Sequence, residues 1–236
     1  MTEELFLTDS YTKEFEACVV KLEGREVILD RTAFYPGGGG QPPDKGSLSI
    51  GPINANVVDV RREGGEIMHV TDTAIPGTVR DLRGKLDWVR RFAHMRYHTA
   101  LHVLSGVIWR NFDARVTGGQ MRAERARMDF SFPGEWTADI VGEIERLTND
   151  ALAEERPVRV YELEREKALA NPDLIRTQVN LVPERVRRIR IVEIQGLDAQ
   201  ADGGTHVANT REVGRIDITG HKSKGHHNKR IEFVLQ

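Results

Sequence analysis

Two pairs of metal-ligating side chains stand out in the sequence, and the members of each pair are four residues apart. His98 and His102 lie in HTALH, and Asp202 and His206 lie in DGGTH far downstream. On a helix, residues i and i+4 share one face, so the two histidines of HTALH can approach one ion. Imidazole and carboxylate groups both bind zinc. The two pairs therefore predict two halves of one metal site.

A different interpretation of HTALH stays open, because a lone HxxxH pattern is weak and also suits two core histidines. His94 extends the row by another turn, but it lies ~12 Å along the axis from His102 at 1.5 Å per residue, too far to share the ion. A zincin protease is excluded, because its HExxH motif requires glutamate where this chain has Thr99.

The elements that must position these residues fall into a strand-rich first third and a mixed remainder. Residues 1–88 contain short alternating runs separated by turn signals such as Gly24-Arg25, which is typical of a small β-barrel or sandwich. From Arg90 to Trp109 the apolar positions recur at helical spacing. We predict an α+β protein with a small β-barrel domain at 1–88 and an antiparallel sheet packed with helices at 89–236.

The second domain is expected to contain further regular elements on the same criteria of spacing and turn residues. The predicted helices cover 136–153 and 165–170, and the predicted strands cover 158–164, 187–194, 213–219 and 229–235.

Composition narrows the function classes. Of 236 residues, 39% are hydrophobic and 30% charged, which is typical of a globular protein. The formal net charge is −2, so any contact with nucleic acid must come from local basic patches. The single cysteine, Cys18, cannot form an intrachain disulfide, and the acidic start does not resemble a signal peptide. We expect a cytoplasmic protein with no membrane partner.

Five segments, taken together, resemble the AlaX family. They follow in the family's order and span residues 33–233. AlaX proteins are free-standing relatives of the editing domain of alanyl-tRNA synthetase, and they hydrolyse mischarged tRNA. The glycine-rich segment resembles the medium-length AlaX-M type. The five segments are AFYPGGGGQPPDKG, HTALHVLSG, VTGGQMRAERARMDFSF, DGGTHVANTREVG and KSKGHHNKRIEF.

The resemblance implies a zinc-dependent aminoacyl-tRNA deacylase. Its substrate would be tRNA(Ala) mischarged with serine or glycine, it would need no ATP, and it would protect translation fidelity. The family's zinc motif is HxxxH followed by CxxxH, which His98, His102 and His206 match. Asp202 stands in the place of the cysteine, and it either ligates the ion or leaves an open position. Asp202 and His94 are the candidate general bases, and the sequence identifies no catalytic residue.

The family also places a threonine after the HxxxH helix to recognise the serine hydroxyl. Thr117 is the matching candidate, and Thr99 and Thr205 are the alternatives because the match requires a small gap. Gln120, in the segment that follows, either lines the substrate pocket or is a solvated loop residue.

Two further segments could contact nucleic acid. Gly37, Gly38, Gly39 and Gly40 could form a phosphate-binding nest, but no Gly-Lys-Ser/Thr follows and two prolines prevent a helix, so ATP or NAD binding is not expected. The resemblance implies tRNA handling or packing of the two domains, and we favour packing.

The stretch GHKSKGHHNKR, residues 220–230, gathers four basic side chains. It is either a solvated turn or a phosphate clamp for the tRNA acceptor end. The basic residues are Lys222, Lys224, Lys229 and Arg230.

Two other functions remain open. The chain could be a non-catalytic tRNA-binding module in which zinc is purely structural, or it could edit another mischarged tRNA such as threonine tRNA. A closed four-ligand site would favour the first of these, because it cannot activate water.

Overall fold

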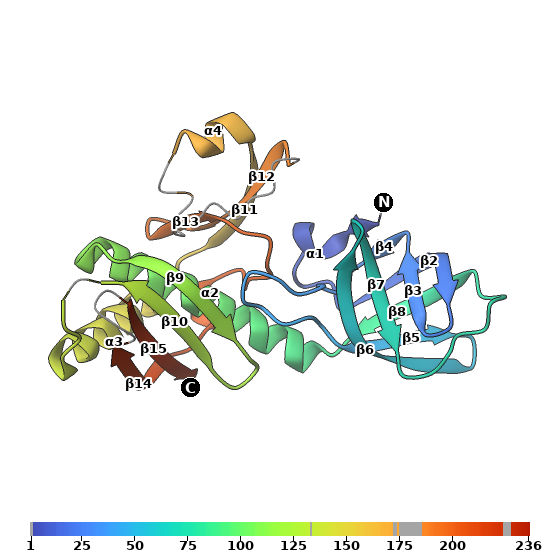
Figure 1. Cartoon of the computed structure of the whole chain (residues 1–236), viewed down its shortest axis with the longest axis horizontal. Helices are drawn as coiled ribbons and strands as arrows, with labels where there is room; N and C mark the ends of the chain where they lie inside the picture. Colours follow the sequence, from blue (N-terminus) through green and yellow to red (C-terminus); the bar gives the residue numbers. More distant parts are fainter. Residues whose placement is uncertain (1, 133, 172–173, 175–185, 224–227) are drawn as a thin grey trace. The chain divides into compact units, whose positions relative to one another are not determined.

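The computed structural model describes residues 2–132, 134–171, 174, 186–223 and 228–236. The chain divides into two compact units, Met1–Met95 and Arg96–Gln236 (Figure 1). The predicted α+β class is confirmed, because the first unit holds a closed barrel and the second holds antiparallel sheets with helices. The domain boundary expected between residues 88 and 89 stays a prediction. Within the described ranges, no helix is long and apolar enough to cross a membrane.

The barrel of the first unit has six strands in the order β2-β3-β7-β6-β5-β8. Its alternation is clearest in β8, where every second residue is buried. The predicted turn at Gly24-Arg25 joins β2 to β3. The bounds are β1 Glu3–Glu4, α1 Leu5–Thr8, β2 Glu14–Glu23, β3 Glu26–Leu29, β4 Arg31–Thr32, β5 Gly46–Ile50, β6 Ile53–Glu63, β7 Glu66–Thr71 and β8 Asp81–Leu86.

A buried histidine is built into the barrel core. His69 Nδ1 lies 3.1 Å from the Val27 carbonyl, so this nitrogen must carry the proton and donate. Its Nε2 therefore accepts from the Thr32 hydroxyl at 2.8 Å, and that hydroxyl oxygen accepts from the Phe34 N–H at 3.1 Å. Burial lowers the pKa of His69 to about 4, so the ring is neutral at neutral pH.

The glycine-rich segment forms no helix, as its sequence predicts. All four of its consecutive glycines, Gly37 to Gly40, have positive φ values between 55° and 134°. The segment is closed at its base, because the Tyr35 N–H donates to Asp44 Oδ2 at 2.7 Å and the Asp44 N–H donates to the Tyr35 carbonyl at 3.0 Å. Asp44 also forms a fully buried ion pair with Arg91. The segment is therefore a turn of the first unit that is fixed by the hydrogen bonds and the ion pair of Asp44.

Helix α2, Trp88–Phe112, contains the HTALH motif. It begins after Asp87, whose carboxylate accepts from the Arg90 N–H at 3.1 Å and caps the first turn. It ends at Phe112, and the next residue, Asp113, has a φ of 49°, a left-handed conformation common after a helix. The helix predicted at 90–109 is confirmed, and the observed helix extends beyond this range at both ends.

The second unit contains two antiparallel sheets, ordered β14-β15-β10-β9 and β11-β12-β13. Helix α3 begins after Thr137, which accepts from the Ile140 N–H at 3.3 Å. The bounds are β9 Arg115–Met121, β10 Ala126–Ser131, α3 Ala138–Ala153, β11 Val158–Glu164, α4 Arg165–Leu169, β12 Arg188–Ile194, β13 Asp198–Ala201, a 3-10 turn at Thr210–Glu212, β14 Ile216–Ser223 and β15 Asn228–Leu235.

Three strands of this unit, β9, β10 and β13, were not predicted. Gln120 was expected in a loop but lies in β9, where it pairs with Arg127 of β10. The basic stretch 220–230 was expected to be a loop or turn, but Lys222 lies in β14 and pairs with Arg230 of β15. Backbone pairing between the two strands extends the hairpin further than the local sequence suggests.

Candidate metal centre

Helix α2 presents His98 and His102 on one buried face. The four-residue spacing brings their ring centroids to 5.2 Å. The side chains are 4% and 9% exposed, so both rings are withdrawn from solvent. The helical geometry predicted for HTALH is therefore confirmed.

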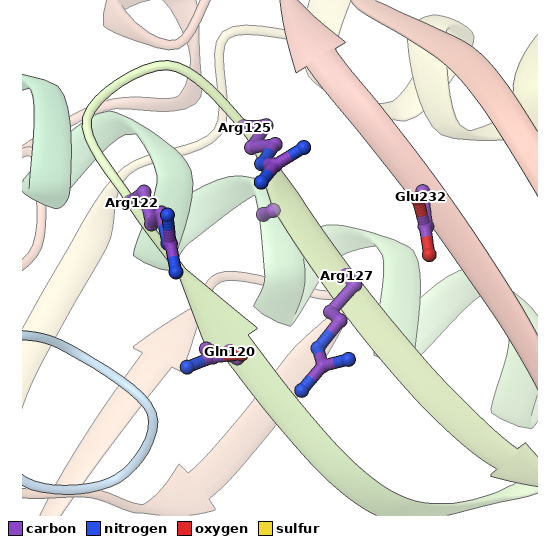
Figure 2. A pocket seen from close by; sticks show the side chains of 6 residues that line it. Gln120, Arg122, Arg125, Arg127 and Glu232 are labelled. Carbon is purple, nitrogen blue, oxygen red and sulfur yellow. The ribbon is translucent and has the colours of Figure 1, made fainter.

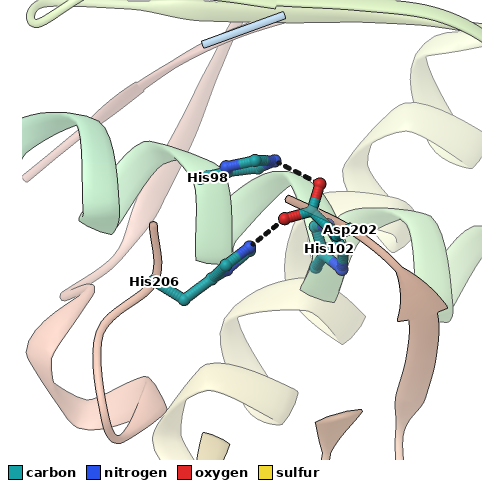
Figure 3. A group of neighbouring side chains, drawn as sticks. All are labelled: His98, His102, Asp202 and His206. Carbon is teal, nitrogen blue, oxygen red and sulfur yellow. Dashed lines mark hydrogen bonds and ion pairs between the residues drawn. The ribbon is translucent and has the colours of Figure 1, made fainter. Parts of the chain in front are cut away.

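The second pair is held by the turn that follows β13. Gly204 N–H donates to Asp202 Oδ2 at 2.7 Å, which closes a tight turn. Arg190, on the neighbouring strand β12, donates from Nη1 to the carbonyls of Asp202 at 2.8 Å and Gly204 at 3.0 Å. These bonds fix the turn, and His206 follows it with its ring directed back to Asp202 (Figure 3).

The donor atoms of the two pairs converge. Asp202 Oδ1 lies 3.5 Å from His98 Nε2, and Asp202 Oδ2 lies 3.0 Å from His206 Nε2 (Figure 3). One ligand atom from each of His98, His102, Asp202 and His206, here called the His–Asp group, lies within 4.8 Å of all the others. Ligands at ~2.0–2.1 Å from a tetrahedral zinc lie about 3.3 Å apart. The donor types and spacing fit a metal ion after small side-chain shifts.

A buried carboxylate sets the orientation of one imidazole. His102 Nδ1 lies 3.1 Å from Asp198 Oδ2, and Asp198 is fully withdrawn from solvent. Gln200 Nε2 holds the same carboxylate, at 3.2 Å from Oδ1 and 2.9 Å from Oδ2. An ionised Asp198 can only accept, so Nδ1 of His102 carries the proton and Nε2 is left as the metal ligand.

A hydroxyl supports the other end of the group. Thr99 Oγ1 lies 3.2 Å from His206 Nδ1 and accepts from the Val207 N–H at 3.2 Å. A hydroxyl can donate to this nitrogen or accept from it. Thr99 can therefore support His206 both when its Nε2–H bonds to Asp202 and when that nitrogen is free for a metal.

Burial sets the protonation of the ligands. It lowers the pKa of His98 well below its usual range and that of His206 to about 4, although the hydrogen bond that His206 donates to Asp202 acts in the opposite direction. Burial opposes the ionisation of Asp202, but the electrostatic interaction with His98 and the hydrogen bond that His206 donates hold the pKa of this carboxyl well below its usual range. Neutral imidazoles and an ionised carboxylate are the forms that bind a metal.

The candidate substrate residues lie in several places. Thr99 and Thr205 are buried, and Thr99 contacts the His–Asp group. Thr117 is exposed on β9, 3.3 Å from Asn228 Oδ1, and Gln120 is exposed on the same strand. His94 is buried one turn before His98 and is not part of the group.

The basic candidates have different surroundings. Lys222 is exposed, whereas Lys229 is buried and donates to Ser223 Oγ at 2.7 Å. Arg230 is buried and forms a bidentate ion pair with Asp129, in which Nε donates to Oδ1 at 2.6 Å and Nη2 donates to Oδ2 at 2.7 Å. Lys224 lies outside the described residues. Gly37 to Gly40 lie in the first unit.

Sequence reasoning missed Asp198 and Arg190. Asp198 lies four residues before Asp202, in LDAQAD, but no spacing rule assigns it to His102 on a distant helix. Arg190 occupies an alternating position of β12, RIRIVEI, like an ordinary outward-facing residue, so its structural role had no local signal.

Models of two families match the chain. The second additional domain of threonyl and alanyl tRNA synthetases matches residues 189–232, which include Asp202 and His206. The class II (A) tRNA synthetase family matches residues 3–86, in the barrel.

Curated relatives match over the full chain. The alanyl-tRNA editing protein AlaX-M of Saccharolobus solfataricus is 41% identical, with all of both chains covered. That of Methanosarcina barkeri is 39% identical, over all of this chain and 99% of its own. The alanine–tRNA ligase of Ignicoccus hospitalis is 38% identical over 99% of this chain, which corresponds to 26% of the ligase.

Proposed function

The chain belongs to the AlaX-M family of alanyl-tRNA editing proteins, and on this premise we propose that it hydrolyses tRNA(Ala) mischarged with serine. Glycine is the second candidate amino acid. The observation that carries the proposal is the His–Asp group, a set of three buried imidazoles and one partly buried carboxylate that fits zinc. A tRNA substrate implies a cytoplasmic site of action.

The reaction is the hydrolysis of an ester. Water adds to the carbonyl carbon, the bond to the terminal ribose oxygen breaks, and that oxygen takes a proton to give free serine and tRNA. A zinc ion held by His98, His102 and His206 would supply Lewis acidity to this chemistry. The chain's own part is to orient the imidazoles, because Asp198 holds His102 in the tautomer that leaves Nε2 free and Thr99 supports the ring of His206.

Asp202 can serve in either of two ways. As a fourth ligand it completes the coordination shell, and its oxygens already face His98 and His206. As a free carboxylate it is a base that can take a proton from the attacking water. Its side chain is 13% exposed, more than the three histidine side chains, so water reaches the group most readily here.

The proposed selection of serine depends on its hydroxyl. Serine is larger than alanine, so a pocket that admits serine also admits alanine by size. A hydrogen bond to the serine hydroxyl is left unmade when alanine enters, which costs about 1–3 kcal/mol. The position of Thr117 supports this role. It lies at a register shift between β9 and β10, and such β-bulges often redirect a side chain towards a functional site.

The test compares hydrolysis of Ser-tRNA(Ala) with hydrolysis of Ala-tRNA(Ala). We expect wild type to favour the serine ester, and Thr117→Val to reduce this preference by about tenfold if about 1.4 kcal/mol is lost. Thr117→Ser keeps the hydroxyl and is the matched control. A Thr117→Val enzyme with wild-type preference would redirect the search to Thr99 and Thr205.

Zinc dependence has its own test. The protein should bind about one zinc per chain, because the four residues form one group. His98→Ala and His206→Ala should lose both the metal and the activity. Full activity in a wild-type protein freed of metal by a chelator would contradict the proposal.

The second candidate function is a tRNA-binding module in which the zinc is purely structural. The position of Asp202 favours it, since its oxygens lie close to two of the histidines and could close the shell. Zinc-loaded protein that binds tRNA(Ala) but cleaves no ester would support this function. Cleavage of mischarged threonine tRNA alone would support editing of that tRNA instead.

A further inference from the structure

The hairpin of β9 and β10 carries three arginines around one hollow (Figure 2). The hollow has a volume of about 290 Å³ and lies wholly in the second unit. None of its residues belongs to the His–Asp group. Its lining, here called the arginine hollow, consists of Gln120, Arg122, Arg125, Ala126, Arg127 and Glu232.

Strand pairing fixes the positions of these side chains. Arg127 lies directly opposite Gln120 of β9 and Glu232 of β15, so the three side chains share one face of the sheet. Arg122 and Arg125 lie where the hairpin turns, joined by a hydrogen bond from the Arg122 N–H to the Arg125 carbonyl at 2.8 Å. The hollow is therefore built on paired strands, which hold it in place without a ligand.

The lining carries three guanidinium groups and one carboxylate, so positive charge is in excess. Across the described ranges, no side chain forms a hydrogen bond or ion pair with Arg122, Arg125 or Arg127, although Glu232 lies opposite Arg127. Arg230, on the same sheet, has its bidentate partner in Asp129. Like charges gathered around one hollow repel each other, and an anion bound among them would remove that repulsion.

We propose that the arginine hollow binds the sugar–phosphate backbone of RNA. The proposal rests on the proposed function and locates a phosphate-contacting surface for the tRNA. Each guanidinium can bind a phosphate through two parallel hydrogen bonds. Gln120 and Glu232 add an amide and a carboxylate, which can bond to ribose 2′-hydroxyls. A free phosphate would leave the carboxylate of Glu232 without such a donor, whereas a ribose phosphate can contact the whole lining.

The test removes the three charges and measures binding of uncharged tRNA(Ala) by full-length protein at several salt concentrations. The variant is Arg122→Gln with Arg125→Gln and Arg127→Gln. The matched control is Arg146→Gln with Arg188→Gln and Arg211→Gln, which removes the same charge from exposed arginines of the same unit that already pair with carboxylates.

We expect the hairpin variant to bind at least about tenfold more weakly. Its slope of log K against log salt should be shallower by about 2, because each phosphate that the protein neutralises contributes roughly 0.7–0.9 to that slope. The control should stay within about twofold of wild type. Equal losses in the two variants, or no loss in either, would overturn the proposal. If the triple variant does not fold, the double variant Arg122→Gln with Arg125→Gln is used, since both side chains are exposed.

Two further measurements separate the possible outcomes. Arginine-dependent binding to phosphatidylserine vesicles, with tRNA binding unchanged, would overturn RNA as the ligand. Wild-type hydrolysis of Ser-tRNA(Ala) is measured in parallel. If hydrolysis is absent but the hairpin variant still loses salt-dependent affinity, the proposed function fails and the arginine hollow stands. If hydrolysis is present and the hairpin variant binds like the control, only the hollow fails.

Discussion

Replacement of Asp198 by asparagine tests how the site prepares its ligands. The substitution keeps the shape of the side chain and removes one acceptor oxygen. In the protein, both oxygens are used, since Oδ2 accepts from His102 Nδ1 and both accept from Gln200 Nε2. The new amide group must therefore face a donor, either that of Gln200 or the Nδ1–H of His102. One of these donors loses its partner in a buried place.

The magnitude follows from the role of the lost bond. Carboxylates that orient a ligating histidine typically contribute 10–100-fold to metal affinity, which corresponds to about 1.4–2.7 kcal/mol. We expect Asp198→Asn to weaken zinc binding by this factor. A buried donor without an acceptor also costs about 1–3 kcal/mol, so the free energy of unfolding of the metal-free protein should fall as well.

The assay is a competition for zinc between the protein and a chromogenic chelator at neutral pH. Hydrolysis of Ser-tRNA(Ala) is followed at limiting and at excess zinc, and excess zinc should restore most of the activity of the variant. Asp150→Asn, on the exposed face of α3, is the charge-matched control. If Asp198→Asn and Asp150→Asn both bind zinc within about twofold of wild type, Asp198 does not orient His102.

Three predictions concern the barrel unit. The pKa of His69 is lowered to about 4 in the folded protein, whereas a histidine in the unfolded chain has a pKa near 6.5. Between these pH values the unfolded chain binds more protons, so the free energy of unfolding should fall by about 3 kcal/mol as the pH drops from about 6.5 to 4. Urea unfolding at pH 7 and pH 5 should show a smaller difference for His69→Gln than for wild type, and equal differences would contradict the assignment. Arg91→Met leaves Asp44 as an unpaired buried carboxylate and should lower the free energy of unfolding by about 3–5 kcal/mol, with part of the loss recovered in the double variant with Asp44→Asn. Gly46→Ala would drive its Cβ into the Lys85 carbonyl on β8, so thermal unfolding should reveal a loss of about 1–3 kcal/mol, and an unchanged midpoint would show that the two strands can separate freely.

Much of the fold could be predicted because its signals are local. Alternation of apolar residues and glycine turns predicted the barrel strands, and helical spacing predicted α2 and α3. The spacing of His98 and His102 also placed both on one helical face without any tertiary information. Strand β9 escaped prediction because Gly118 and Gly119 interrupt its alternation, whereas β10, ARMDFS, does alternate and was missed although its local signal is present.

The sequence by itself therefore determined most of the secondary elements, the two half-sites and, through the family's motifs, their combination into one group. Only the tertiary structure decided which side chains support that group, because the partners Asp198, Thr99 and Arg190 come from separate elements. It also decided the surroundings of the basic residues. Arg230 is neutralised by Asp129 across a strand pair, whereas Arg127 lies beside Glu232 without bonding to it. The charge of a side chain is set by its type, but whether that charge is free to meet a ligand depends on the neighbours that strand register brings to it.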